Sequence, residues 1–150
     1  MDQTTETGPF GPNLAAMLLD RARAWAGRPM LRAFREGAWH ATSWGEFARA
    51  VASLARGLAA AGIAPGDRVA IVAGNRPEYP IAETALMAIR AVPVPAYVTN
   101  TVADHAHILR DCGARGVIVA GAKLAETVGE AAARIGGIDL MVTLDEAAAE

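Results

Sequence analysis

The chain has 150 residues, of which 53% are apolar and 20% charged, with a formal net charge of −2. This length fits one ordinary domain, and the apolar share excludes a disordered body. The lack of a basic excess and an aromatic share of only 5% argue against nucleic-acid binding. Cys112 is the single cysteine, which excludes an internal disulfide.

The sequence predicts neither a membrane-spanning helix nor a signal peptide. No window approaches the roughly 18 consecutive apolar residues of a membrane helix. The acidic, polar N-terminus lacks the basic and apolar regions of a signal peptide. We therefore expect no integral membrane segment and a cytoplasmic location.

The first fifty residues predict an arm, a helix and a hairpin. Residues 1–12 form a flexible arm without periodicity, and Asn13 caps a helix that Gly27 and Pro29 end. Residues 30–34 and 38–42 then form the two strands of a hairpin. A capping box at Ser43–Glu46 opens the next helix, which Gly62 ends with a left-handed conformation. Its buried face is a stripe at helical spacing, comprising Trp44, Phe47, Val51, Leu54 and Leu58.

From residue 68 onward, short apolar runs alternate with helical patterns. The runs at 69–73, 92–94, 117–120 and 140–143 predict four strands of a parallel sheet. The helices between them begin near Pro77, at Thr101 and near Leu124. The fold class is therefore α/β, a mostly parallel βαβ sheet preceded by an N-terminal helix and a β-hairpin.

Candidate metal and nucleophilic sites are weak. His105 and His107 would face opposite sides of a helix, and His40 stands alone in a strand, so we predict no metal site. We expect His105 to be a solvated residue near the helix cap. Cys112 is interpreted as a buried, inert thiol, because no nearby residue argues for a nucleophile.

Two loops that follow predicted strands could have either a structural role or a role in ligand binding. Asn75 precedes Pro77 and Glu78, which favours a helix cap over an anion site. Residues 97–100 follow the strand at 92–94, where α/β sheets place ligands. Tyr97, Thr99 and Asn100 are thus candidates for the edge of a substrate cleft, although an ordinary loop capped by Thr101 is the favoured interpretation.

Five motifs follow one another along the middle of the chain, namely TSWGEF at 42–47, AGIAPGDRVAI at 61–71, NRPEY at 75–79, VPVPAY at 92–97 and ILRDCGAR at 108–115. In this order they resemble the N-terminal part of the adenylate-forming (AMP-binding) enzymes, in particular acyl-CoA synthetases of the long-chain-fatty-acid–CoA ligase type. The sequence departs from that pattern at Arg90, where the family usually has glycine, which would affect the packing of helix against strand.

The resemblance implies an ATP-dependent ligase. In the complete enzyme a carboxylate, a fatty or related acid, forms an acyl-adenylate with ATP and Mg²⁺, and coenzyme A then displaces AMP. The family's Ser/Thr/Gly-rich phosphate loop is absent here, and Lys123 is the only lysine. We expect residues 13–150 to be an incomplete N-terminal part of an AMP-binding domain, with no catalytic residue, no cofactor of its own and no activity alone.

The expected partners are the remainder of the ligase and a small-molecule carboxylic acid, with no nucleic acid. An alternative is a free-standing α/β binding or interaction module, or a decayed remnant, without catalysis. A downstream reading frame that encodes the phosphate loop would favour the ligase over this module.

Overall fold

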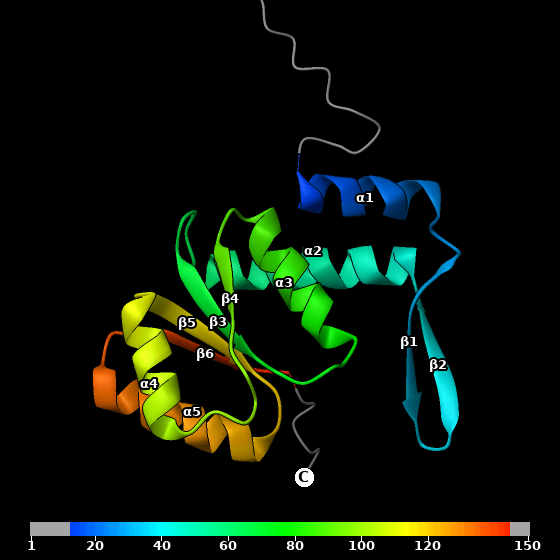
Figure 1. The fold of residues 1–150 in the computed structure, drawn as a ribbon. Helices are drawn as coiled ribbons and strands as arrows, with labels where there is room; N and C mark the ends of the chain where they lie inside the picture. The colour runs from blue at the N-terminus through cyan, green and yellow to red at the C-terminus, as the bar shows by residue number, and fades with distance from the viewer. Residues whose placement is uncertain (1–12, 145–150) are drawn as a thin grey trace, which may run out of the picture.

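The computed structural model describes residues 13–144 (Figure 1), so the predicted arm at 1–12 and the end of the chain at 145–150 lie outside the described residues. The elements in chain order are α1 (Leu14–Ala24), β1 (Pro29–Arg35), β2 (Ala38–Ser43), α2 (Trp44–Ala60), β3 (Arg68–Val72), α3 (Glu78–Ala88), β4 (Val92–Pro95), α4 (Val102–Asp111), β5 (Ala114–Val119), α5 (Ala122–Ile135) and β6 (Leu140–Thr143). The predicted helix, hairpin and alternating α/β pattern are all present.

The four later strands form one parallel sheet in the order β4-β3-β5-β6. Each strand follows the preceding one through a helix, as expected for βαβ units. The central strands β3 and β5 are almost completely buried, which explains their nearly continuous apolar sequence. The prolines Pro93 and Pro95 lie in β4, an edge strand, where a missing backbone donor is tolerated.

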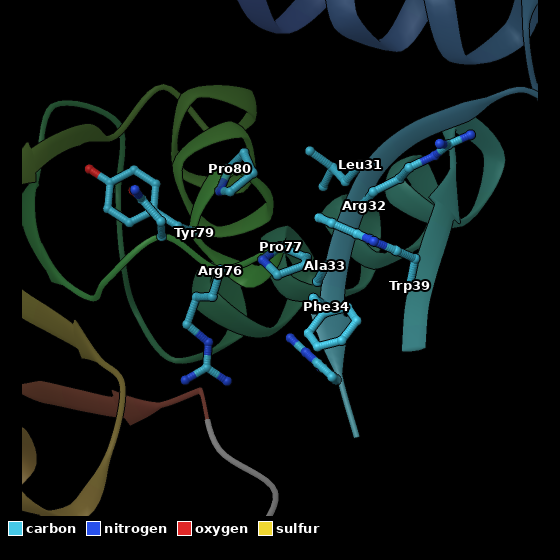
Figure 2. A pocket seen from close by; sticks show the side chains of 11 residues that line it. Leu31, Arg32, Ala33, Phe34, Trp39, Arg76, Pro77, Tyr79 and Pro80 are labelled. Atoms are coloured by element: carbon cyan, nitrogen blue, oxygen red, sulfur yellow. The ribbon is translucent and has the colours of Figure 1, made fainter. Parts of the chain in front are cut away.

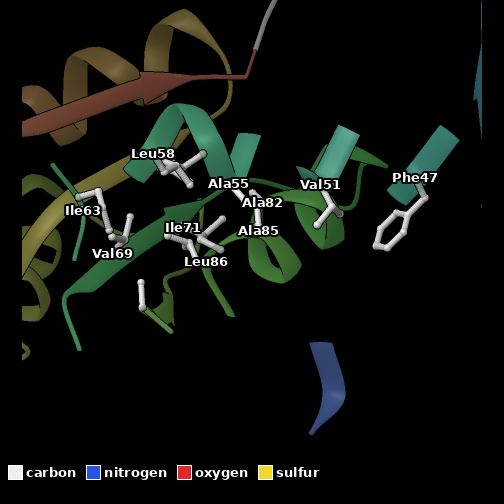
Figure 3. Close-up of a cluster of buried hydrophobic side chains, with 12 residues drawn as sticks. Phe47, Val51, Ala55, Leu58, Ile63, Val69, Ile71, Ala82, Ala85 and Leu86 are labelled. Atoms are coloured by element: carbon white, nitrogen blue, oxygen red, sulfur yellow. The ribbon is translucent and has the colours of Figure 1, made fainter. Parts of the chain in front are cut away.

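Helices cover both faces of this sheet. Helices α2 and α3 pack on one face, where Phe47, Val51 and Leu58 of α2 belong to one buried cluster with Ile71 of the sheet (Figure 3). Helices α4 and α5 pack on the other face against the alternate residues of β3 and β5. This arrangement places two hydrophobic clusters around the sheet and directs loops from neighbouring strands to opposite faces.

The helix ends follow the local sequence signals. Ser43 and Glu46 form the predicted capping box, in which the Ser43 amide donates to Glu46 at 2.8 Å and the Glu46 amide donates to the Ser43 hydroxyl at 3.2 Å. Thr101 caps α4 as predicted and forms a second capping box with Asp104. Because each box satisfies otherwise free amide groups, the start of each helix is fixed.

Arg90 occupies the position that ends α3. Its φ of 65° is left-handed, and the amide of Ala91 donates to the carbonyl of Leu86 at 3.0 Å, as in a Schellman motif. The exposed side chain leaves the packing of α3 against β4 intact. Arginine in place of glycine therefore destabilises the backbone conformation of residue 90 and does not disturb the neighbouring packing.

Candidate functional site

A hollow of about 490 Å³ lies at the carboxyl ends of β3 and β4. It is the end of the sheet at which α/β folds bind ligands. Its lining comes from the loop after β3, from the first turn of α3 and from the loop after β4. The lining residues are Ala73, Gly74, Asn75, Tyr79, Pro95, Ala96, Tyr97 and Val98.

Backbone hydrogen bonds fix the loop after β4 that lines this hollow. The amide of Ala96 donates to the carbonyl of Ile71 at 3.0 Å, which continues the pairing of β4 with β3 beyond the strand. The amide of Asn100 donates to the carbonyl of Tyr97 at 3.3 Å and forms a turn. Gly74 also lines the hollow, and a Cβ atom added to it would meet no atom within 4 Å.

The structure separates the three predicted cleft residues. Tyr97 lines the hollow with 80% of its surface exposed, and its neighbour Val98 lines it as well. Thr99 is exposed, Asn100 is half-buried, and neither is among the lining residues. The loop from Tyr97 to Asn100 therefore reaches the hollow only through its first two residues.

Two further lining residues, Asn75 and Tyr79, were not among the predicted cleft residues. The interpretation of Asn75 as a helix cap is wrong, because Pro77 is the N-cap of α3 and no side chain caps that helix. Asn75 instead lines the hollow, as does Tyr79 on the first turn of α3. Burial raises the pKa of Tyr79, and the nearby Glu83 adds to this, so the phenol is a neutral donor. The sequence feature that could have identified them is that both residues closely follow the buried strand β3, at the start of the next helix.

A second hollow of about 470 Å³ lies between the hairpin and the start of α3 (Figure 2). It shares Asn75 and Tyr79 with the first, and Figure 2 shows the Tyr79 ring on the side away from β1. Three basic side chains line it, Arg32, Arg35 and Arg76, of which the last two are paired with Glu78, whereas no charged side chain lines the first hollow.

Glu78 connects the hairpin to α3. It accepts hydrogen bonds from Arg35 at 2.8 Å and from Arg76 at 2.9 Å. Burial by itself would raise the pKa of Glu78, but the hydrogen bonds from the two arginines outweigh it and lower the pKa to about 2. Glu78 is therefore ionised at neutral pH, and it has a structural role beside the second hollow.

The expectation for His105 is wrong. It is buried, with 1% of its surface exposed, and its Nε2 atom has no hydrogen-bond partner among the described residues. Burial lowers the pKa of His105, and the adjacent Asp104 only partly opposes this. His107 on the same helix is exposed, as the predicted opposite orientation of the two side chains requires. Burial likewise raises the pKa of the half-buried Cys112 thiol, which makes a reactive thiolate less accessible.

Within residues 13–144, no group of three or more His, Cys, Asp or Glu side chains is placed to hold a metal ion. No helix in the same range is both long and apolar enough to cross a membrane.

Residues 19–150 match the AMP-binding enzyme family. The chain belongs to this family. The long-chain-fatty-acid–CoA ligase FadD15 of Mycobacterium tuberculosis is 31% identical over 99 residues, covering 66% of this chain and 16% of the relative. A feruloyl-CoA synthase from Amycolatopsis is 41% identical over 105 residues, covering 70% of this chain and 21% of the relative. The chain thus spans about a sixth to a fifth of the length of these relatives.

Solved structures of AMP-binding enzymes share the fold described above. A benzoate CoA ligase from Burkholderia xenovorans superposes with a TM-score of 0.74 at 26% identity, over 85% of this chain and 25% of that chain. A fatty acyl CoA synthetase of Mycobacterium tuberculosis gives a TM-score of 0.74 at 24% identity, over 92% of this chain and 30% of that chain. The predicted resemblance to adenylate-forming enzymes is therefore confirmed, as is the α/β fold class.

Proposed function

We propose that this chain forms the N-terminal part of an ATP-dependent acid–CoA ligase. The observation that carries the proposal is the match of residues 19–150 to the AMP-binding enzyme family, together with relatives named as CoA ligases. In the proposed reaction a carboxylate oxygen attacks the α-phosphate of ATP and releases pyrophosphate. The sulfur of coenzyme A then attacks the acyl carbon of the adenylate, and AMP leaves. We include the expected cytoplasmic location in this proposal.

We propose that these residues have a structural role, in which they form one wall of the acid site and position its loops. The parallel sheet orders the loops after β3 and β4, and the hollow between them provides a wall for the acid. ATP and Mg²⁺ are assigned to the remainder of the ligase, where the ion would neutralise phosphate charge. This division follows from the sequence, since it has no phosphate loop and Lys123 is its only lysine. The 150-residue chain alone is therefore proposed to be inactive.

The proposed acid has an apolar body, and a fatty acid is the first candidate because FadD15 is named for long-chain fatty acids. An aryl acid is the second candidate. Two observations favour it, namely relatives named for feruloyl and 4-coumarate substrates and the polar side chains of Asn75 and Tyr79 in the hollow. In either case Tyr97, Thr99 and Asn100 are proposed to lie at the edge of the substrate cleft.

The test uses a complete ligase that contains this chain. Tyr97→Ala and Asn100→Ala are compared with Val92→Ala, an exposed control at the opposite end of β4. We expect Tyr97→Ala to lower kcat/KM for the preferred acid by about tenfold, or about 1.4 kcal/mol of transition-state binding. Unchanged kinetics across acids of different length, with only a lower thermal stability, would contradict a role for the loop in the cleft.

The competing function is a free-standing binding module without catalysis. It predicts acid binding without ATP chemistry, whatever polypeptide is joined to the chain. Acid-dependent exchange of pyrophosphate into ATP by a longer polypeptide that includes this chain would exclude it.

A further inference from the structure

The imidazole of His105 is buried in the inner face of α4 without a full set of partners. It lies at helical spacing with Val102 and Leu109, which pack into the cluster between α4, α5 and the sheet. Only 1% of the surface of His105 is exposed, and its Nε2 atom has no hydrogen-bond partner in the part of the chain that the structure describes. A buried polar atom without a partner has lost its hydration, which is unfavourable. The packing of α4 thus includes one group that water would stabilise.

A positive charge on this imidazole would be far less favourable than the neutral form. The sheet residues of the cluster that α4 joins are all apolar, namely Ala70, Val72, Ala114, Val117 and Val119. His105 also lies in the first turn of α4, where the helix dipole disfavours a positive charge. Burial accordingly lowers the pKa of His105 below its ordinary value. The packed helix therefore requires a neutral histidine.

The neighbouring carboxylate does not compensate for such a charge. The Oδ2 atom of Asp104 accepts hydrogen bonds from the Thr101 amide at 3.0 Å and from the Thr101 hydroxyl at 2.8 Å, in the capping box of α4. Rotation of Asp104 toward His105 would break both bonds and leave the start of the helix uncapped. The charge of Asp104 therefore raises the pKa of His105 by less than burial lowers it.

The other charged groups around α4 are exposed or bound elsewhere. On α4 itself, His107, Arg110 and Asp111 are exposed. The elements that contact α4 are α5 and β5, and their charged side chains are exposed as well, namely Arg115, Lys123, Glu126, Glu130 and Arg134. Arg68 of β3 donates to backbone carbonyls at the opposite end of α4. None of these groups is placed to neutralise a buried imidazolium.

Helix α4 belongs to a layer that can separate without the rest of the fold. Helices α4 and α5 cover one face of the sheet and α2 and α3 the other, and the two hydrophobic clusters share no buried residue (Figure 1). With ten residues, α4 exposes little surface when it opens, and such local openings need less free energy than global unfolding. The loop from Tyr97 to Asn100 leads directly into the cap of α4.

We propose that His105 makes α4 a proton-sensitive element, in which uptake of a proton from solvent by the opened imidazole holds α4 and the loop before it away from the sheet. The loop then keeps only its attachment to β3, the hydrogen bond from the Ala96 amide to the Ile71 carbonyl. Since Ala96 and Tyr97 line the hollow at the ends of β3 and β4, one wall of that hollow becomes mobile in acid. The inference needs only the packing of α4, so it does not depend on the ligase proposal.

Hydrogen exchange of the 150-residue protein at about pH 7.5 and about pH 5.5, corrected for intrinsic exchange rates, measures the opening of each helix. We expect the opening constant of α4 to rise about tenfold between them, because each pH unit below about 6.5 favours the protonated, open form by up to tenfold. The opening of α4 should change little in low urea, because it exposes little surface. Exchange of α2 should instead rise steeply with urea, as global unfolding requires.

Three variants assign the response to His105. His105→Leu places an apolar side chain in the cluster and should remove the pH response of α4. His105→Gln keeps a polar side chain that does not titrate and should remove it as well. His107→Gln is the matched control, because His107 is exposed on the same helix and its loss should leave the response intact. Circular dichroism confirms that each variant is folded.

Three results would overturn the inference. They are an opening constant of α4 that does not depend on pH, a pH response that persists in both His105 variants, and exchange of α4 that follows the urea dependence of α2. The last result would mean that protonation acts on global unfolding alone. The Thr101 amide, which donates to Asp104, should lose protection together with α4. Protection retained there in acid would contradict the release of the loop.

Discussion

The side chain of Arg68 and the backbone of Gly113 fit each other closely. The Arg68 guanidinium donates from Nη2 to the Gly113 carbonyl at 2.7 Å and from Nε to the Cys112 carbonyl at 2.7 Å. Gly113 has a φ of 59°, and a Cβ atom there would lie 2.7 Å from Nη2 of Arg68. The start of β3 is thereby connected to the end of α4, whose last carbonyls would otherwise lack donors.

Removal of this guanidinium should destabilise the fold. Arg68→Met keeps the aliphatic stem and loses these two hydrogen bonds and a third, which Nη1 donates to the Gly66 carbonyl at 3.2 Å. We therefore expect unfolding to require about 2 kcal/mol less free energy. Arg110→Met is the control. Arg110 is exposed on α4 and forms no ion pair or side-chain hydrogen bond within residues 13–144. Urea denaturation measures both. Equal losses for the two variants would show that the contact with Gly113 has no special role.

Arg90→Gly should stabilise the protein. The left-handed φ of 65° is unfavourable for arginine and free of strain for glycine, so we expect a gain of about 1 kcal/mol. Arg110→Gly makes the same exchange within the last turn of α4 and should lose about 1 kcal/mol. Thermal unfolding of the two variants measures both changes in stability. A loss of stability for Arg90→Gly would contradict this account, because it would mean that the arginine side chain stabilises the fold.

His105 should make the stability of the protein depend on pH. Its folded-state pKa lies below its ordinary value near 6.5, so the unfolded chain binds a proton first as the pH falls. Stability is then lost from about pH 6.5 downward until the folded-state pKa is reached, by up to about 1.4 kcal/mol per pH unit. His105→Leu should remove this loss, whereas His107→Gln, an exposed neighbour, should keep it. Parallel pH profiles for wild type and His105→Leu would contradict this account.

The hairpin should promote self-association. Phe34 and Trp39 pair across its strands with ring centroids 5.5 Å apart, and 60% and 70% of their surfaces are exposed. Apolar surface of this kind favours association and the binding of hydrophobic dyes. A Phe34→Ser, Trp39→Ser double variant should bind less dye, while Leu14→Ser, exposed by 52%, should change little. A monodisperse wild-type monomer with weak dye binding would instead favour the free-standing module.

The fold could be predicted well because its signals are local. Ser43 with Glu46 determines where α2 begins, and the buried strands β3 and β5 are short, almost purely apolar runs. The burial of His105 could not be predicted in this way. It depends on how α4 packs against the sheet and α5, and a histidine beside an aspartate in the first turn resembles a solvated cap.

The candidate site was only partly predictable for a related reason. Tyr97 follows a strand directly, so the rule that ligands lie at the carboxyl ends of strands located it. Asn75 and Tyr79 meet Tyr97 only because β3 and β4 are neighbours in the sheet, and sequence order does not specify that neighbour. The helix start at Pro77 also suggested an ordinary cap, which directed attention away from Asn75.

Acid-dependent exchange of pyrophosphate into ATP tests the central proposal most directly. The chain alone is compared with a chimera in which its matching segment replaces the corresponding 105 residues of the Amycolatopsis feruloyl-CoA synthase, folding being verified first. The account predicts no exchange by the chain alone and exchange by the chimera within about tenfold of the parent synthase, a difference of about 1.4 kcal/mol. A folded chimera without exchange, or exchange by the pure chain that a substitution within it abolishes, would contradict the account.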